Sequence, residues 1–348
     1  MKLFELWSYL KTAEKPILLY GMGNGADKII DRLLLDGVSV SGVFASDGYV
    51  RNQCFRGFKV ISYSEAVETF KNFIVLVAFG SKRTEVLENV QKIAARQELY
   101  VVDVPVFGDT VFDKKFYESR KEDYDYILSS LADERSKEVF NAIVDFKLSG
   151  SLATLKSAED KEESTFSDLI NLQSSDIIFD LGAYIGDTAA QFLELQPDLS
   201  KIVAVEPAIK NFKKLEDLSI KEPKIIPINA AVSLSKNEVL FSGTSGRNQS
   251  IGTGTQTVKA ISIDELTEKF GAPNFIKFDV EGNESEAIIS GQNTIKDHSP
   301  TLYISTYHRS EDIFDIPKAV LSINPNYNMF IRHYPHIPCW DTYYIFKK

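Results

Sequence analysis

The stretch IIFDLGAYIGDT, residues 177–188, decides the fold of this chain. Its apolar beginning predicts a buried strand that reaches its end at Asp180, and Gly182 and Gly186 follow in a turn that opens a helix. In an open α/β sheet, such a strand–turn–helix unit forms part of a ligand crevice at the carboxyl ends of the strands. The spacing departs from the dinucleotide fingerprint G-x-G-x-x-G, because a carboxylate stands where the turn begins. That carboxylate would repel a pyrophosphate and suits a ligand with positive charge.

The next two predicted strands carry residues that suit an adenosine-like ligand. Glu206 ends KIVAVEP (201–207), and an acidic residue at that place can accept hydrogen bonds from both hydroxyls of a ribose. Small residues in NAAVS (229–233) leave room for a flat ring such as adenine, although tight backbone packing explains them equally well. S-adenosylmethionine (SAM) combines an adenosine with a sulfonium and an ammonium group. The pattern therefore favours SAM as the ligand.

The second half of the chain alternates strands with helices, which predicts βαβ units and a mainly parallel sheet. An antiparallel closing pair at the end makes this a seven-stranded arrangement of the methyltransferase type. The expected strands are 176–182, 201–207, 224–233, 274–282, 301–308, 329–334 and 341–347.

The first hundred residues also alternate strands with helices, and they predict a separate parallel sheet. Residues 110–175 mix charged and aromatic residues with three-to-four apolar spacing, which indicates helices over 116–131 and 134–148. We therefore expect an α/β protein of two Rossmann-like domains joined by a helical connector. The expected boundaries are 1–109, 110–165 and 166–348. The expected N-terminal strands are 16–21, 38–45, 73–79 and 99–107, with helices at 26–37, 64–70 and 84–97.

The N-terminal domain carries a second glycine turn, YGMGNGA (20–26), which fits the dinucleotide fingerprint between a strand and a helix. Polar residues follow the second and third strands, and basic ones there suit a phosphate. A nucleotide, a sugar-nucleotide or NAD(P) is the implied ligand, and an inherited fold that only positions the other domain is the alternative. The candidate residues of this site are Gly21, Gly23, Asp47, Lys82 and Arg83.

Composition limits the class of protein. The chain has 348 residues, which favours two domains, and a formal net charge of −10, which argues against broad nucleic-acid binding. Only Cys54 and Cys339 are present, so a disulfide framework is not expected. The N-terminus lacks the pattern of a signal peptide, and the apolar runs are of strand length. We expect a cytoplasmic protein without a membrane partner, and the oligomeric state stays open.

Acidic residues gather where the fourth strand of the second sheet ends. Asp279 and Glu281 close FIKFDVEG (275–282), and His308 ends the following strand. Carboxylates at a strand end can bind an ammonium group or a metal, or accept the proton of a reacting hydroxyl. His308 is a third candidate base because an imidazole titrates near neutral pH, and a structural histidine is the alternative.

His333 and His336 stand in the predicted closing pair of strands. With Asp279, Glu281 and His308 they could hold a divalent metal, because imidazole and carboxylate groups suit such ions. The spacing matches no recognised metal motif. We therefore expect no metal.

A loop rich in glycine and serine, residues 242–256, interrupts the second domain. It is either an exposed hairpin loop or a lid over the substrate. Arg247 and Asn248 are the residues in it that could contact an acceptor.

The second half of the chain resembles the FkbM family of SAM-dependent methyltransferases over roughly residues 165–348. This combination is much more specific than one glycine turn. The resemblance implies a class I methyltransferase fold, SAM as cofactor and O-methylation of a hydroxyl. The matching stretches are DLGAYIGDT (180–188), AVEPAIKNFKKL (204–215), NAAVS (229–233), FIKFDVEGNESEAIISG (275–291), ISTYHRSEDIFDIP (304–317) and RHY…CWDTYYIF (332–346).

The resemblance also implies roles for particular residues. Asp279 would lie beside the methionine part of SAM or beside the acceptor hydroxyl. One departure is that Asp341 follows the tryptophan of the last stretch, where the family commonly has glutamate. The expected SAM-binding residues are Asp180, Gly182, Ala183, Tyr184, Gly186, Asp187, Thr188, Glu206, Pro207, Asn229, Ala231 and Asp279, and the expected catalytic residues are Asp279, Glu281 and His308.

The function expected from the sequence is methyl transfer from SAM to a hydroxyl of a sugar, a glycan or a natural product. One alternative is an NAD(P)- or nucleotide-sugar-dependent enzyme that uses the N-terminal turn. The other is a binding protein without catalysis, in which the first domain senses a nucleotide.

Overall fold

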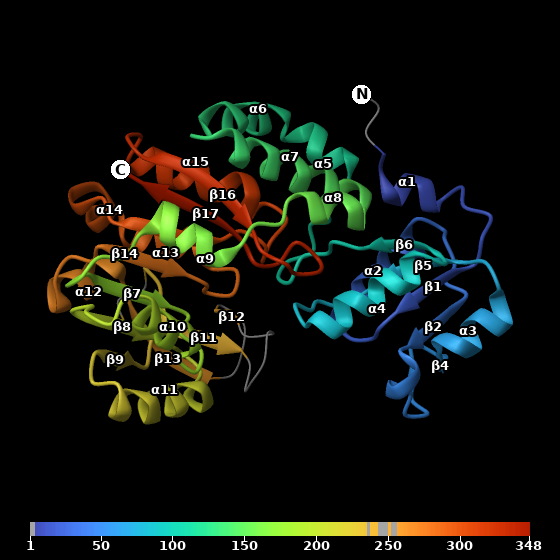
Figure 1. Cartoon of the computed structure of the whole chain (residues 1–348), viewed down its shortest axis with the longest axis horizontal. Helices are drawn as coiled ribbons and strands as arrows, with labels where there is room; N and C mark the ends of the chain where they lie inside the picture. Colours follow the sequence, from blue (N-terminus) through green and yellow to red (C-terminus); the bar gives the residue numbers. More distant parts are fainter. Residues whose placement is uncertain (1–3, 235–236, 243–249, 252–255) are drawn as a thin grey trace.

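The computed structural model describes residues 4–234, 237–242, 250–251 and 256–348. Two α/β lobes are joined by a layer of helices, which runs along the top of the molecule in Figure 1. The N-terminal lobe comprises the elements from α1 to β6, and the C-terminal lobe comprises those from β7 to β17. The predicted α/β class with two Rossmann-like sheets is confirmed.

The sheet of the N-terminal lobe has the order β3-β4-β2-β1-β5-β6 and is parallel except for β3. Sequence patterns missed β3 and β4, because a short hairpin between polar residues has little hydrophobic periodicity. The strand expected over 99–107 ends at Val101, where the chain turns towards the connector. The elements are α1 (Leu6–Leu10), β1 (Ile17–Tyr20), α2 (Asn24–Leu35), β2 (Gly42–Ala45), η1 (Asp47–Tyr49), β3 (Cys54–Phe55), β4 (Phe58–Ser62), α3 (Tyr63–Phe70), β5 (Ile74–Val77), α4 (Thr84–Ala94) and β6 (Glu98–Val101).

The connector consists of helices that together contact both lobes. The N–H group of Val101 in β6 donates to the carbonyl of Gly150, where α7 ends. On the other side, Arg332 of β16 donates to Asp133, which caps the start of α7. The helices are α5 (Lys114–Ser119), α6 (Lys121–Ser130), α7 (Glu134–Ser149), α8 (Leu152–Ser157) and α9 (Glu162–Ser164), followed by the π-helical turn η2 (Thr165–Ile170).

The main sheet of the C-terminal lobe has seven strands in the order β16-β17-β15-β14-β7-β8-β9. Only β17 runs against its neighbours β15 and β16, so the expected antiparallel closing pair and the class I methyltransferase order are both present. The strands are β7 (Ile177–Leu181), β8 (Lys201–Val205), β9 (Ile225–Ile228), β14 (Phe275–Phe278), β15 (Thr301–Ser305), β16 (Asn328–His333) and β17 (Thr342–Lys347). The helices are α10 (Asp187–Leu195), α11 (Ile209–Lys221), α12 (Ile263–Phe270), α13 (Glu284–Ser290), α14 (Gln292–His298) and α15 (Asp312–Ile323).

A small second sheet follows β9 in this lobe. It contains β10 (Ala231–Val232), β11 (Glu238–Ser242), β12 (Ser250–Ile251) and β13 (Gln256–Ile261) in the order β10-β13-β11-β12. The single strand expected over 224–233 is therefore two strands in two sheets. Arg247 and Asn248 lie outside the described residues.

The central strands of both sheets are buried on both faces, as crossover helices on each side require. Among the described residues, no helix is long and apolar enough to cross a membrane. The domain boundaries at residues 109 and 165 stay a prediction.

Candidate active site

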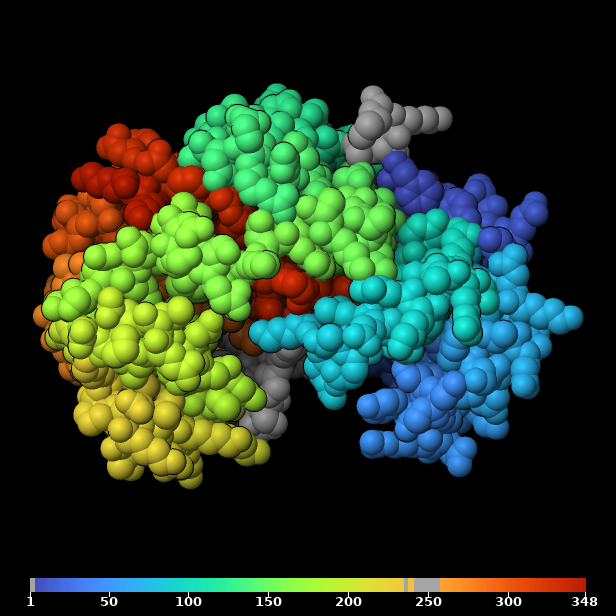
Figure 2. Space-filling view, viewed as in Figure 1, coloured from blue at the N-terminus to red at the C-terminus, as the bar shows by residue number. Residues whose placement is uncertain are grey.

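A cavity of about 460 Å³ lies where β7, β8, β14 and β15 have their carboxyl ends. This is the edge at which open α/β sheets bind ligands. Most lining residues come from the C-terminal lobe, whereas Lys82 comes from the N-terminal lobe, Val106 from the segment after β6, and Glu162 and Phe166 from the connector. In Figure 2, red atoms of the C-terminal segment are visible between the two lobes, below the connector.

The turn after β7 brings two strand ends into direct contact. Gly182 has φ +79°, and a Cβ atom there would lie 1.9 Å from the carbonyl oxygen of Asp279. Any other residue would therefore clash with the backbone at the end of β14. This close approach places Gly182 and Asp279 in one wall of the cavity.

Asp180 lies behind this wall and does not line the cavity. Its carboxylate is fully buried, and Lys277 Nζ donates to Asp180 Oδ1 at 3.0 Å. Lys277 lies beside Asp180 in the register of β14 and β7, and its Nζ is also 3.9 Å from Asp279 Oδ2. Burial alone would lower the pKa of Lys277, but Asp180 and Asp279 raise it above its usual value. Asp180 therefore orients a charged lysine that does face the cavity.

Sequence reasoning missed Lys277, although FIKF holds a lysine inside an apolar strand. A buried lysine needs a carboxylate partner, and that rule could have pointed to Asp180. The pairing itself depends on the strand register, which the sequence alone does not give.

Glu206 is 4% exposed and lines the cavity at the end of β8. Its carboxylate accepts hydrogen bonds from the N–H groups of Tyr184 (3.0 Å) and Ala208 (2.9 Å) and from Asn211 Nδ2 (3.3 Å). Burial raises the pKa of Glu206 to about 7, although these hydrogen bonds act to lower it. No ion pair fixes this carboxylate among the described residues, so a hydroxyl donor from a ligand fits it.

The expected SAM-binding residues divide into two groups. Some line the cavity and others do not. Asn229 is one that does not, and its Nδ2 donates to the carbonyl of Glu206 at the end of β8. The residues that line the cavity are Gly182, Tyr184, Asp187, Thr188, Glu206, Pro207, Ala231 and Asp279, whereas Asp180, Ala183, Gly186 and Asn229 are absent from its lining.

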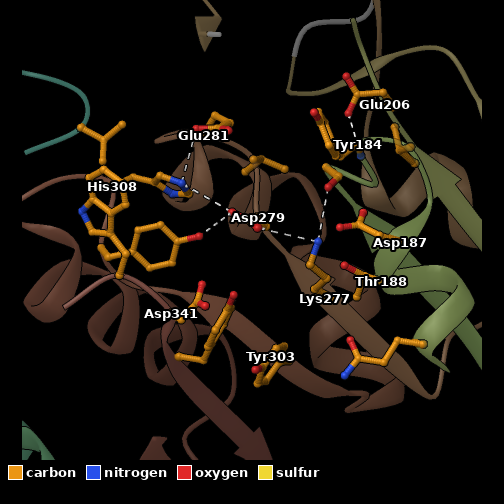
Figure 3. A pocket seen from close by; sticks show the side chains of 18 of the residues that line it. Tyr184, Asp187, Thr188, Glu206, Lys277, Asp279, Glu281, Tyr303, His308 and Asp341 are labelled. Atoms are coloured by element: carbon orange, nitrogen blue, oxygen red, sulfur yellow. Dashed lines mark hydrogen bonds and ion pairs between the residues drawn. The ribbon is translucent and has the colours of Figure 1, made fainter. Parts of the chain in front are cut away.

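The three expected catalytic residues meet at one point, as Figure 3 shows. His308 Nε2 lies 3.5 Å from both Asp279 Oδ1 and Glu281 Oε2, and the hydroxyl of Tyr307 donates to Asp279 Oδ1 at 3.2 Å. Burial alone would lower the pKa of His308, but the surrounding carboxylates raise it to about 10. The imidazole therefore carries a proton at neutral pH, which is the opposite of what a general base requires.

Glu284 is the residue that fixes His308 from behind, and sequence reasoning missed it. Its Oε1 lies 2.8 Å from His308 Nδ1 and accepts hydrogen bonds from the N–H of Val280 (3.1 Å) and from Ser305 Oγ (3.2 Å). Glu284 is the first residue of α13 and follows Glu281 by three positions in the sequence. The only signal in the sequence was a third acidic residue in DVEGNE.

Of the five residues considered for a metal, Asp279, Glu281 and His308 meet, whereas His333 and His336 have other partners. His333 Nδ1 bonds to Thr342 Oγ1 at 2.9 Å, burial lowers the pKa of His333 to about 3, and His336 Nδ1 faces the carbonyl of Pro338. Ligand atoms of Asp279, Glu284 and His308 do lie within 4.8 Å of one another. The expected absence of a metal stays a prediction.

The residues predicted for a nucleotide site in the N-terminal lobe are not brought together. Asp47 accepts from both the N–H (3.0 Å) and the hydroxyl (2.7 Å) of Ser64 at the start of α3, and Arg83 pairs with Glu85. Lys82 lines the cavity of the other lobe.

The glycine turn itself is covered by an aromatic side chain. A Cβ atom at Gly21 would lie 2.5 Å from Phe79 Cδ1, so Phe79 occupies the space beside the turn. A cavity of about 250 Å³ remains, lined mainly by apolar side chains that include Met22, Val104 and Trp340. Gly21, Gly23, Asp47, Lys82 and Arg83 are absent from its lining.

Residues 180–329 match the sequence model of the family described as "Methyltransferase FkbM domain". Hexuronic acid methyltransferase AglP from Haloferax volcanii is 28% identical over 155 residues, which cover 42% of this chain and 62% of that protein. The match thus spans less than two thirds of that curated relative. These findings confirm the resemblance for the C-terminal lobe.

A solved structure is similar over both lobes. Methyltransferase FkbM from Methylobacillus flagellatus KT superimposes with a TM-score of 0.72 at 18% sequence identity, covering 99% of this chain and 94% of that chain. At this level of identity the similarity shows a shared fold. It extends the likeness to the N-terminal lobe and the connector.

Proposed function

We propose that this chain, whose residues 180–329 form a methyltransferase domain of the FkbM family, transfers the methyl group of SAM to a hydroxyl oxygen of a sugar or glycan. One observation carries the proposal: the cavity joins a buried carboxylate at the end of β8 to a pair of carboxylates at the end of β14. The relative from Haloferax volcanii supports a sugar as the class of acceptor.

The described residues fit SAM at the first half of the cavity. Glu206 would accept from the ribose hydroxyls, as acidic residues at this strand end do. Ala231 leaves space for the adenine beside it. Asp187, at the start of α10, also lines the cavity, where its carboxylate would attract the positive charge of SAM. When bound, SAM supplies an electrophilic methyl group.

The second half of the cavity supplies a proton acceptor. An attacking hydroxyl must lose its proton, and Asp279 and Glu281 are the side chains proposed to take it. The charged His308 pairs with both carboxylates, and the Tyr307 hydroxyl donates to Asp279. His308 thus has a positioning role in this proposal.

Thermal unfolding with S-adenosylhomocysteine tests the cofactor. We expect millimolar ligand to raise the Tm of the wild-type protein, because a ligand that binds only the folded state stabilises it. Glu206→Ala should remove most of the shift, and Glu216→Ala, on the exposed side of α11, should keep it. An unchanged Tm of the wild-type protein would contradict the proposal.

The remaining expectations are part of the same proposal. Its partners are a small-molecule or glycan acceptor rather than a nucleic acid or a membrane, and its location is cytoplasmic. A nucleotide- or NAD(P)-dependent activity of the N-terminal lobe has no support, because Asp47 and Arg83 are engaged elsewhere and Phe79 covers the turn.

A further inference from the structure

Consecutive residues after β5 hold the C-terminal segment against the N-terminal lobe. A Cβ atom at Gly80 would lie 2.2 Å from the Trp340 ring, so the indole rests directly on this backbone. The next residue, Ser81, exchanges two backbone hydrogen bonds with Ile337, at 2.8 and 3.0 Å. The space that a nucleotide would need beside β5 is therefore used by the other lobe.

The third residue of this series, Lys82, adds an ion pair with the C-terminal segment. Its Nζ lies 3.3 Å from Asp341 Oδ2, and both side chains line the 460 Å³ cavity. The Lys82 side chain is 69% exposed, so its ammonium group can also bond to a ligand. The Asp341 side chain is 20% exposed, and a pair that is open to solvent on one side contributes little to stability.

Trp340 stands beside the proposed proton acceptors. Its ring is 6.5 Å from the ring of Tyr307 at an interplanar angle of 27°, and the Tyr307 hydroxyl bonds to Asp279. Trp340 also lines the smaller cavity, so its side chain belongs to the walls of both cavities. A half-buried indole at this place offers a flat apolar face next to polar groups, as ligand sites commonly do.

The charge of the cavity restricts the acceptor that this face can take. An additional negative charge would be repelled by the excess of carboxylates, and an uncharged ring would not. The described lining residues that carry charge are the acidic Glu162, Asp187, Glu206, Asp279, Glu281 and Asp341 and the cationic Lys82, Lys277 and His308.

We propose that Trp340, Asp341 and Lys82 form the acceptor subsite and that it takes an uncharged sugar ring. The apolar face of the ring lies on Trp340, and its hydroxyls bond to the Lys82–Asp341 pair. The N-terminal lobe thereby supplies part of the acceptor site in place of a nucleotide site. This inference rests on the proposed methyl transfer, which fixes the acceptor end of the cavity.

Tryptophan fluorescence tests the subsite without knowledge of the natural acceptor. The chain has two tryptophans, Trp7 in the core of the N-terminal lobe and Trp340. With saturating S-adenosylhomocysteine, we expect titration with neutral sugars (glucose, galactose, mannose, fucose, rhamnose) to give a saturable change with at least one. Trp340→Phe should abolish the change, and Trp7→Phe should keep it.

Variants of the loop after β5 provide the matched comparison. Lys82→Ala should weaken binding of the active sugar about tenfold, as loss of a charge-assisted hydrogen bond does. Arg83→Ala is the control, because Arg83 is exposed, pairs with Glu85 and does not line the cavity. Glucuronate should bind more weakly than the neutral sugar, in contrast to the hexuronic acid named for the relative from Haloferax volcanii.

The outcomes separate the two proposals. A wild-type protein that does not bind S-adenosylhomocysteine contradicts the proposed function. The subsite is overturned by a protein that binds this ligand but shows no response of Trp340 to any neutral sugar. It is also overturned if Lys82→Ala matches Arg83→Ala, or if glucuronate binds more tightly than the neutral sugar.

Discussion

The two glycine turns of this molecule have the same local form and different surroundings. Both follow a buried strand and open a helix, at residues 20–26 and 181–187. Beside the second turn, Glu206 faces a cavity with no ion-pair partner among the described residues. Beside the first turn, Phe79 covers the glycine and Asp47 bonds to Ser64. A ligand site therefore depends on what the neighbouring strands contribute more than on the glycine spacing.

The largest expected difference between the turns concerns stability. Gly182→Ala would place a Cβ atom 1.9 Å from a backbone oxygen, whereas a Cβ atom at Gly23 would meet nothing within 4 Å. Both glycines have positive φ, so alanine is strained at either position, but of the two only Gly182 would also bring a clash. We expect a loss in free energy of unfolding of about 4 kcal/mol or more for Gly182→Ala and about 1–3 kcal/mol for Gly23→Ala, which lies at φ 114° and ψ −166°. Urea denaturation measures both, and equal losses would contradict this account of the turn.

The next largest effect concerns the acids at the two sites. Asp279→Asn should lower kcat by about a hundredfold or more, because a positioned proton acceptor contributes that much. Asp47→Asn in the N-terminal lobe should leave kcat unchanged. Turnover is measured as S-adenosylhomocysteine released in the presence of the acceptor sugar. A normal kcat for Asp279→Asn together with a normal kcat for Glu281→Gln would exclude both as the base.

A pH dependence follows from Glu206. Its pKa of about 7 lies above the usual value for glutamate, so it gains a proton as the pH falls through 7 and can no longer accept from both ribose hydroxyls. We expect affinity for S-adenosylhomocysteine to be constant above pH 8 and to fall about tenfold per pH unit below 7. Glu206→Gln should bind weakly at all pH values without this slope. An unchanged slope in that variant would assign the titration to another group.

The raised pKa of Glu206 also has a consequence for the ligand-free protein. The folded state prefers the protonated carboxyl, so its stabilising contribution is present at low pH and is lost as the pH rises through about 7. Glu206→Gln should therefore raise the Tm at pH 8 more than at pH 5. The opposite order would contradict the sign of the shift.

The smallest expected effect is at the N-terminal turn. NADH, UDP and UDP-glucose should leave the Tm of the wild-type protein unchanged, because the predicted contacts for them do not converge. A Tm increase that Asp47→Ala removes would restore a nucleotide site in this lobe.

The sequence predicted the sheet well and the site in part. Strand–helix alternation predicted a mainly parallel sheet with an antiparallel closing pair, and the carboxyl ends of its strands bring Gly182, Glu206 and Asp279 together. Lys277 and Glu284 were missed, because the role of Lys277 arises from strand register and that of Glu284 from a contact between the start of α13 and His308 after β15. The contact between Gly80 and Trp340 joins residues 260 positions apart in the sequence, and no local sequence pattern predicts it.

Calorimetric titration of the wild-type protein with S-adenosylhomocysteine tests the central claim most directly. One site per chain is predicted, abolished by Glu206→Ala and retained in Gly23→Ala, since Glu206 beside the turn after β7 lines a cavity and has no ion-pair partner among the described residues. Absence of binding, or binding that Gly23→Ala removes and Glu206→Ala leaves intact, would contradict it.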